Sequence, residues 1–202
     1  KLPIISSPMD TISEEEMALT MSKNGGMSII HRYNEPEEQA AIVKKAVNSG
    51  ADVVGAAVGV TNGYMERAEL LIEAGASVIC IDVAHGHHAL TEKAIKSIKA
   101  KYPYVHLMAG NVATKEGFEA LVEWGADSIR CNIGGGSICT TRVQTGHGVP
   151  GLQTIFECAN AANAKGVKII ADGGIRNAGD IVKALAAGAD FVMVGSLLSG
   201  TD

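Results

Sequence analysis

The sequence is poor in aromatic residues, in proline and in clustered positive charge. Of its 202 residues only 4% are aromatic and five are proline. No apolar run reaches the about 18 residues of a membrane-spanning helix, and the start, KLPIISSPMD, lacks the pattern of a signal peptide. The net charge is −5 and the pI about 5.7, with no basic run, which argues against nucleic-acid binding. We therefore expect a cytoplasmic protein that binds neither membranes nor nucleic acids.

Cysteine is also scarce, and its spacing is uninformative for metals. The four cysteines show no C-x-x-C pattern, which argues against a structural zinc site and against a disulfide framework. Cys80, Cys131 and Cys158 lie in apolar strands or on a predicted helix, where a cysteine is usually buried and inert. Cys139 differs, because it lies in the polar, glycine-rich stretch GGGSICTTR (134–142). The thiolate is the reactive form of cysteine, so Cys139 is the candidate nucleophile.

Glycine and aliphatic residues are plentiful, and they recur in a short phrase. The phrase reads SGADVV at Ser49, AGASVI at Ala74, WGADSI at Trp124 and AGADFV at Ala187. Each copy follows a stretch with helical periodicity and leads into an apolar run. Glycine suits the left-handed residue that ends a helix. The repeated helix–loop–strand unit indicates parallel β/α architecture.

Eight such apolar runs can be counted, and most are continuous, as expected for strands covered on both faces. The predicted strands are 3–7, 27–31, 53–58, 78–83, 106–111, 128–133, 168–172 and 191–195. Helices are expected from Ser13, which with Glu16 would form a capping box, and near 36–48, 64–74, 90–101, 115–124, 152–165 and 178–187. This order predicts a (β/α)8 TIM barrel, with a doubly wound open sheet as the alternative.

The predicted domain organisation is a single catalytic barrel over residues 1–202. We expect the last helix to be missing after the eighth strand.

The active site of such a barrel lies at the carboxyl ends of its strands, and polar residues and glycines gather there. The loops after strands seven and eight supply Gly173, Gly174, Gly195 and Ser196, whose backbone N–H groups could bind a phosphate. The alternative is that these glycines only serve tight turns. Asp82, at the end of strand four, is placed to accept hydrogen bonds from ligand hydroxyls.

Three further features carry less weight. The histidines of the HGHH stretch, His85, His87 and His88, could suggest a metal site, but a polar pocket wall or a solvated loop is favoured because zinc needs well-directed ligands. No G-x-G-x-x-G follows a strand, so a dinucleotide would bind without that fingerprint. Arg142 is a cation close to Cys139 in sequence.

At GGGSICTTR the chain resembles the IMP dehydrogenase and GMP reductase family. The resemblance extends over the whole chain through PIISSPMDT, GGMSIIHR, VGAAVGV, IDVAHGHH, AGNVAT, ADGGIRNAGDI and GSLLSGT, in the family's order. It implies a (β/α)8 barrel that binds a purine nucleotide monophosphate (IMP, XMP or GMP) and a nicotinamide cofactor, and that forms a homotetramer. One position departs from the family pattern, since Asn132 replaces the first glycine of G-I-G-x-G.

The resemblance also implies roles for individual residues. Cys139 matches the nucleophile that adds to C2 of the purine, and Thr141 the threonine beside it. Asp172 matches the aspartate that holds the ribose hydroxyls. The remaining assignments are Ser137, Gly173, Gly174, Gly195 and Ser196 for the phosphate, Ser7, Met9, Asn111, Arg130 and Met193 for the rest of the substrate pocket, Asp82, Val83 and Ala84 for the cofactor, and the carbonyls of Gly134, Gly136 and Cys139 for a potassium ion.

Three functions remain open from the sequence. The SSPMD and GSLL-GT motifs favour an NAD-dependent dehydrogenase that oxidises IMP to XMP. By the resemblance, the chain is expected to be truncated at both ends and to contain no inserted regulatory domain of the kind that many dehydrogenases carry, because residues 34–49 run directly to the third strand. This direct run is common in GMP reductases, which use NADPH to convert GMP to IMP. A purine nucleotide sensor without turnover is the third, and the intact Cys139-Thr140-Thr141 argues against it.

Overall fold

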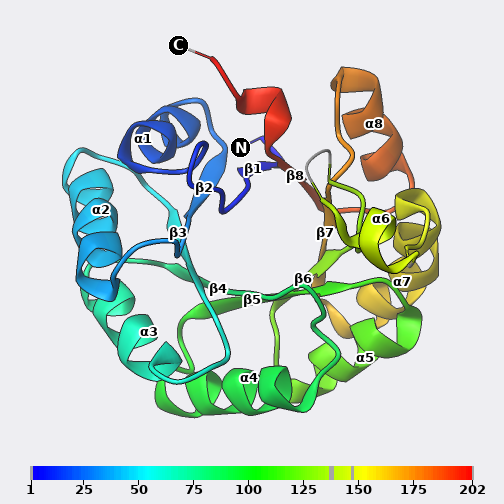
Figure 1. Ribbon diagram of the computed structural model, residues 1–202, viewed down its shortest axis with the longest axis horizontal. Coiled ribbons are helices and arrows are strands. Elements are labelled where there is room, and N and C mark those ends of the chain that lie inside the picture. Colours follow the sequence, from blue (N-terminus) through cyan, green and yellow to red (C-terminus); the bar gives the residue numbers. More distant parts are fainter. Residues whose placement is uncertain (1, 137–138, 147, 202) are drawn as a thin grey trace.

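Eight parallel strands close into a barrel in this computed structural model, which describes residues 2–136, 139–146 and 148–201. Each strand pairs with its neighbour in sequence, and the last strand pairs with the first (Figure 1). Closure confirms the TIM barrel and rules out the open sheet. The strands are β1 (Ile4–Ser6), β2 (Met27–Ile30), β3 (Val54–Val58), β4 (Val78–Asp82), β5 (His106–Val112), β6 (Ser128–Cys131), β7 (Lys168–Asp172) and β8 (Phe191–Val194).

The helices form a ring outside the strands (Figure 1). Seven were predicted and all seven are found, most within a residue or two of the expected bounds. They are α1 (Glu15–Lys23), α2 (Pro36–Asn48), α3 (Tyr64–Glu73), α4 (Ala89–Lys101), α5 (Lys115–Trp124), α7 (Gly151–Lys165) and α8 (Ala178–Ala186). Two short elements were not predicted: α6 (Thr141–Thr145), in the loop after β6, and the 3-10 helix η1 (Ser196–Leu198).

The predicted capping box at Ser13 is wrong. Helix α1 begins at Glu15, and its N-cap is Glu14, which makes no side-chain cap. The Ser13 hydroxyl instead donates to the carbonyl of Ser7 and lies 2.6 Å from the Ser6 hydroxyl. Ser6 in turn donates to Ser28 over 2.7 Å. Ser13 is therefore used to hold the end of β1 against β2 and α1.

The repeated phrase has the expected geometry. Gly50, Gly75, Gly125 and Gly188 end their helices with φ of 97°, 105°, 110° and 114°. A side chain at such a φ is strained, so glycine fits each turn from helix to strand. Because the turns are alike, the strands that follow enter the barrel in the same way.

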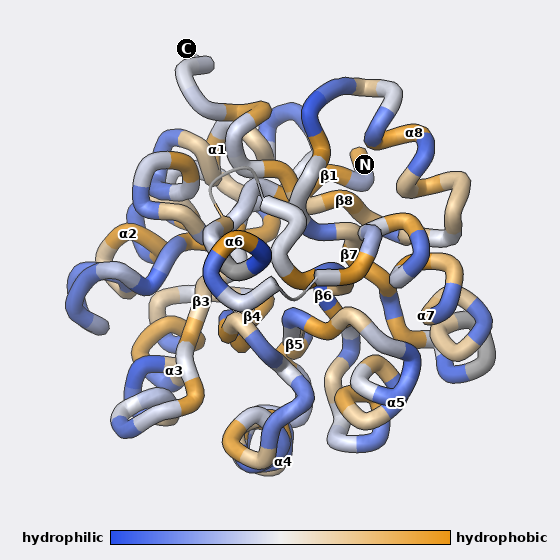
Figure 2. Tube along the Cα trace, turned by 45° about the vertical axis from the view of Figure 1, so that its right-hand side comes forward, coloured by the Kyte–Doolittle hydropathy of each residue, from blue (hydrophilic) through white to orange (hydrophobic). Residues whose placement is uncertain are grey.

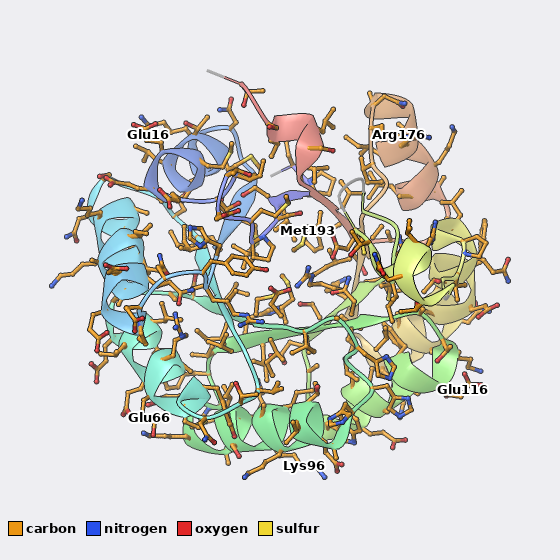
Figure 3. All side chains as sticks on the ribbon, in the orientation of Figure 1. Glu16, Glu66, Lys96, Glu116, Arg176 and Met193 are labelled. Atoms are coloured by element: carbon orange, nitrogen blue, oxygen red, sulfur yellow. The ribbon has the colours of Figure 1, made fainter. Side chains whose placement is uncertain are left out.

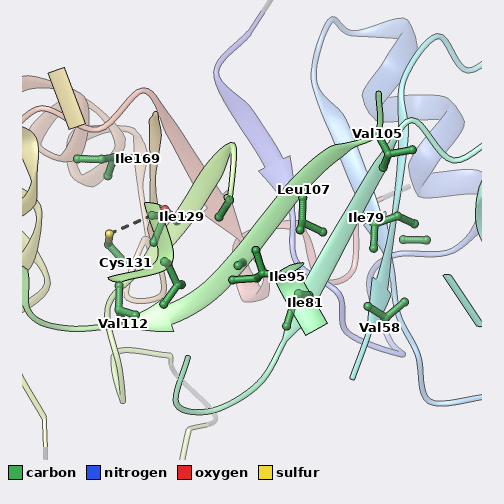
Figure 4. Close-up of a cluster of buried hydrophobic side chains, with 14 of the residues drawn as sticks. Val58, Ile79, Ile81, Ile95, Val105, Leu107, Val112, Ile129, Cys131 and Ile169 are labelled. Atoms are coloured by element: carbon green, nitrogen blue, oxygen red, sulfur yellow. Dashed lines mark hydrogen bonds between the residues drawn. The ribbon is translucent and has the colours of Figure 1, made fainter. Parts of the chain in front are cut away.

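The hydrophobic core has two parts. The larger lies between the strands and the helices and contains Ile79, Ile81, Leu107 and Ile129 (Figure 4). A smaller cluster fills the inside of the barrel, formed by Ile5, Ile29, Ala57, Val78, Cys80, Met108, Ile170 and Met193. Apolar residues accordingly dominate the strands, while polar ones lie on the outer faces of the helices (Figure 2). Among the described residues, no helix combines the length and apolarity needed to cross a bilayer.

Candidate active site

Three charged side chains from different strands meet inside the mouth of the barrel. Arg130 of β6 pairs with Asp82 of β4 through Nη1, and its Nη2 lies 2.8 Å from Oδ2 of Asp172 on β7. Arg130 Nε donates to the same carboxylate oxygen over 3.1 Å. Asn111 Nδ2 also donates to it, over 2.8 Å. One arginine thus links two carboxylates at the carboxyl ends of the strands.

Strand geometry explains why these side chains meet. Residues two apart in a strand point the same way, so Asp82 continues the inward row of Val78 and Cys80, and Asp172 that of Ile170. The inward row is therefore apolar in the barrel and charged at its mouth.

A glycine next to Arg130 makes the close approach of β5 and β6 possible. A Cβ at Gly110 would lie 2.7 Å from Cβ of Arg130 and 2.8 Å from its carbonyl oxygen. Any larger residue there would push the arginine out of place.

Arg130 is protonated over the whole accessible pH range. Burial lowers the pKa of its guanidinium, but the carboxylates of Asp172 and Asp82 raise it by more, and the net pKa lies well above the usual value. The side chain is only 7% exposed. A buried charge of this kind is tolerated because it is paired and hydrogen-bonded.

A first cavity of about 240 Å³ opens beside this cluster, between the ends of β1, β7 and β8. Met193, near the centre of the barrel in Figure 3, lies in its wall. It brings together most of the residues expected at the nucleotide: Ser7, Met9, Arg130, Cys139, Asp172, Gly173, Gly174, Met193, Gly195 and Ser196. Pro8, Tyr33, Asp82, Gly136 and Ile175 complete the wall.

The glycines of this wall have different constraints. Gly173 and Gly174 have φ of 84° and 77°, so their turn itself requires glycine. Gly195 has an ordinary φ of −118°. There a Cβ would lie 2.8 Å from the sulfur of Met9, so its lack of a side chain keeps the wall open.

A second cavity of about 390 Å³ adjoins the first and also has Cys139 in its wall. It contains Val83, Ala84, Asn111 and Gly134, which the first cavity lacks. Both cavities share Tyr33, Asp82, Arg130, Gly136, Cys139, Asp172 and Gly173. The described residues expected at the substrate line the first cavity, except Asn111, which lines only the second. Of the residues expected at the cofactor, Val83 and Ala84 line only the second cavity and Asp82 lines both, as does Cys139.

The other three cysteines are buried, as predicted. Burial raises the pKa of the Cys80 thiol to about 12. A hydrogen bond with Cys158, together with burial, raises the pKa of the Cys131 thiol well above its usual value. Cys139, by contrast, is half-buried in the loop. Only this thiol borders the two cavities.

The histidines of HGHH are exposed on the β4–α4 loop. His88 caps α4, its Nδ1 accepting from the backbone N–H of Leu90 over 3.1 Å, and the ring of His87 lies 5.9 Å from that of Trp124. Within the described parts of the chain, no group of three His, Cys, Asp or Glu side chains is arranged to hold a metal ion.

The loop that carries Cys139 is held at both ends. Arg142 Nη2 donates to the carbonyl of Val149 over 2.9 Å, and its side chain packs against Gly134 and Gly148. The backbone N–H of Cys139 donates to the carbonyl of Gly136 over 3.1 Å. Thr141 begins α6. Ser137, expected at the phosphate, lies outside the described residues.

Comparison with known proteins identifies the family of the chain. A family model described as IMP dehydrogenase / GMP reductase domain matches residues 1–202. The chain belongs to this family. It is 41% identical over 244 residues to an inosine-5'-monophosphate dehydrogenase of Cryptosporidium parvum, with 100% of the chain and 60% of that protein covered.

Two further relatives with the same name show similar values. The family member from Bacillus subtilis is 44% identical over 208 residues, which cover 98% of the chain and 43% of that protein. The one from Borreliella burgdorferi is 38% identical over 249 residues, which cover 99% and 62%. The chain thus spans between about two fifths and three fifths of the length of these family members.

Two residues to which the sequence analysis assigned no role belong to the site. Arg32 and Tyr33 line the second cavity from the end of β2. Arg32 Nη2 donates to the carbonyl of Asp82 over 3.1 Å. The ion-pair cluster itself had one available signal: Arg130 is a charged residue within an apolar strand, and a buried charge requires a partner.

Proposed function

We propose that this barrel oxidises IMP to XMP with NAD+, and that Cys139 forms a covalent adduct at C2 of the purine. The observation that carries the proposal is the position of Cys139 in the wall shared by the two cavities. A nucleophile that borders both the substrate cavity and the cofactor cavity can hold C2 of the purine next to the nicotinamide that would accept the hydride. The names of the family relatives support the dehydrogenase assignment.

In the first cavity we assign the nucleotide monophosphate. Asp172 is held by Asn111 and Arg130 through one carboxylate oxygen, which orients the side chain toward ribose hydroxyls. Backbone N–H groups around Gly173, Gly174, Gly195 and Ser196, together with Ser137, would bind the phosphate. Ser7, Met9 and Met193 would line the base.

In the second cavity we assign the nicotinamide half of the cofactor. Asp82 would accept from the ribose hydroxyls, with Val83 and Ala84 along the same wall. These residues would hold NAD+, which would supply the acceptor for the hydride of C2. Cys139 would add to C2 as the thiolate, and it would be released as the thiol when water replaces the sulfur at C2 to give XMP. Asp82, Asp172 and Arg130 would hold the nucleotide and the cofactor in fixed positions at the barrel mouth.

A decisive assay uses the full-length protein with IMP and NAD+ and follows NADH by absorbance. We expect NADH to form, and Cys139→Ala to abolish turnover while IMP still binds, because the covalent step is lost. The matched control is Cys158→Ala, which should keep turnover apart from a packing cost. A Cys139→Ala protein with near-normal turnover would refute the covalent role.

GMP reduction is the second candidate, because the family description covers both activities. The same assay separates the two, since a reductase consumes NADPH with GMP and forms no NADH from IMP. If both reactions are absent and IMP binds, the barrel is a nucleotide-binding protein.

We also propose a potassium ion at the carbonyls of Gly134, Gly136 and Cys139. Carbonyl oxygens are ligands that suit this ion. The Gly136 carbonyl accepts one hydrogen bond from Cys139 and keeps its second lone pair. Replacing potassium by sodium at constant ionic strength should lower turnover; equal rates in both salts would contradict the proposal.

For assembly we propose a homotetramer, which rests on the family resemblance. The physical support is exposed apolar surface on α7 and α8, where Phe156 is 58% and Val182 65% exposed. Light scattering of the full-length protein should give four times the mass of one full-length subunit. A fully active monomer would contradict it.

A further inference from the structure

Asn132 has an unusual backbone conformation. Its φ is 112°, and within the described residues it is the only non-glycine residue with a positive φ. This conformation strains any residue with a side chain, although asparagine tolerates left-handed backbone better than most. Asn132 follows the last residue of β6 and begins the loop that carries Cys139.

The side chain of Asn132 bridges to the neighbouring strand. Its Nδ2 donates to the backbone carbonyl of Asp172 over 2.9 Å. Its own backbone carbonyl accepts from Nδ2 of Asn111 over 2.9 Å. Asn132 therefore connects the cysteine loop to the ends of β5 and β7, next to the residues that hold the Asp172 carboxylate.

Asn132 also lies directly beneath the loop. It is 6% exposed, and a Cβ built on Gly135 would lie 2.0 Å from its Nδ2. A Cβ on Gly151, at the start of α7, would lie 3.1 Å from the same atom. The amide is thus enclosed by both ends of the segment between β6 and α7.

Stability alone does not favour asparagine at this position. Its φ is strained, and its Oδ1 is buried with no hydrogen-bond partner in the described part of the chain. A buried polar atom without a partner is destabilising. Glycine would relieve both penalties. What glycine cannot supply is the bond from Nδ2 to the carbonyl of Asp172.

We propose that Asn132 is a positioning residue for the reaction, because its side-chain amide fixes the loop bearing Cys139 against the β7 residue Asp172. The proposal rests on the function assigned to Cys139 above. Through this bond the thiol and the carboxylate keep a constant separation, so that a nucleotide held by Asp172 presents its base to the thiol.

The test uses two substitutions with opposite effects on the backbone. Asn132→Asp keeps the shape and the tolerance of positive φ, but places a carboxylate oxygen against the Asp172 carbonyl. Asn132→Gly relieves the strain and removes the bond. We expect both to lower kcat/KM for IMP about tenfold or more, as loss of a buried hydrogen bond would. Asn132→Gly should do so without a lower thermal midpoint.

A second readout does not depend on turnover. The rate at which iodoacetamide alkylates Cys139, followed by mass spectrometry of the peptide, should change in both variants, and protection by IMP should weaken. The matched control is Asn24→Asp, because Asn24 Nδ2 also donates to a backbone carbonyl, that of Thr20, over 2.9 Å at the exposed end of α1. This control should behave as the wild type in both assays.

The outcomes are distinguishable. If Asn132→Gly keeps kcat/KM and the alkylation rate within twofold of wild type, the positioning role is wrong. The same conclusion follows if Asn132→Asp lowers kcat/KM only in proportion to a loss of folded protein. If the wild type binds IMP but shows no turnover with NAD+, the proposed function fails instead, and the alkylation rates still decide whether Asn132 positions the loop.

Discussion

The inside of the barrel and its mouth are built from the same strands, but apolar side chains fill the inside and charged side chains gather at the mouth. Inside, the inward rows carry Ile29, Cys80, Met108 and Ile170, which are at most 2% exposed. The sulfur of Cys80, next to the mouth, accepts from Arg130 Nη1 over 3.6 Å. At the mouth, the same rows end in Asp82 and Asp172, with Arg130 between them. One step of two residues along a strand thus separates a buried apolar layer from an ionic cluster.

This difference shows how the fold divides stability from chemistry. The inner layer gains stability from burial of apolar surface, and its shape tolerates little change. The mouth holds charges that cost desolvation and that are stabilised only by one another. The loop that carries Cys139 lies at the mouth, where Cys139, Asp82 and Asp172 line both cavities.

The sharpest expected contrast is between Cys139 at the mouth and Cys80 inside. A rise of the Cys80 pKa from 9.0 to about 12 reduces its thiolate fraction at neutral pH about a thousandfold. Iodoacetamide should therefore label Cys139 in the folded protein and leave Cys80 unlabelled, as read by peptide mass spectrometry. In urea both should react, which serves as the control. Labelling of Cys80 at the rate of Cys139 in the folded state would break the contrast.

Removing the central cation should be the most damaging change to stability. Arg130→Met leaves the carboxylates of Asp82 and Asp172 without their partner, and we expect a loss of about 3–5 kcal/mol in the free energy of unfolding. Urea denaturation at pH 7 measures it. The control is Arg176→Met, whose exposed contact with Asp180 is 3.8 Å long and should matter by less than about 1 kcal/mol. Equal losses would show that the mouth cluster adds nothing special.

A small change inside the barrel should lower the free energy of unfolding without changing ligand affinity. Ile29→Val removes one methylene from a fully buried residue and should cost about 0.5–1.5 kcal/mol. Calorimetric affinity for IMP should stay unchanged, because Ile29 lines neither cavity. A lower affinity at unchanged stability would mean that the inner layer reaches the site.

The smallest effect concerns pH at the opposite end of the barrel. Burial lowers the pKa of His106, which lies 2.9 Å from the Ser128 hydroxyl. On acidification below about pH 6.5 the unfolded chain binds the proton first, so stability falls. His106→Gln should remove this loss, which we expect to be below about 1 kcal/mol between about pH 7.5 and pH 5. Exposed His85→Gln is the control, and it should keep the wild-type pH profile of unfolding.

Much of the fold could be predicted because its signals are local. The phrase around Gly50, Gly75, Gly125 and Gly188 marks each helix end, since a left-handed φ requires glycine at a defined place in the chain. Continuous apolar runs then locate the strands. The Ser13 capping box failed because a tertiary contact with Ser7 used the hydroxyl that the local pattern assigned to the helix.

The sequence by itself determined the eight strands and the order of the units, because periodicity and turn residues act between near neighbours. It also singled out Cys139, because its surroundings are polar. Only the tertiary structure decided that Arg130 lies between Asp82 and Asp172, 48 and 42 residues away in the chain, and that Asn132 reaches Asp172. Such contacts follow from barrel closure, which brings residues of different strands together at one face. A pattern of neighbouring residues cannot predict them, because the partners are at least 40 residues apart in the chain.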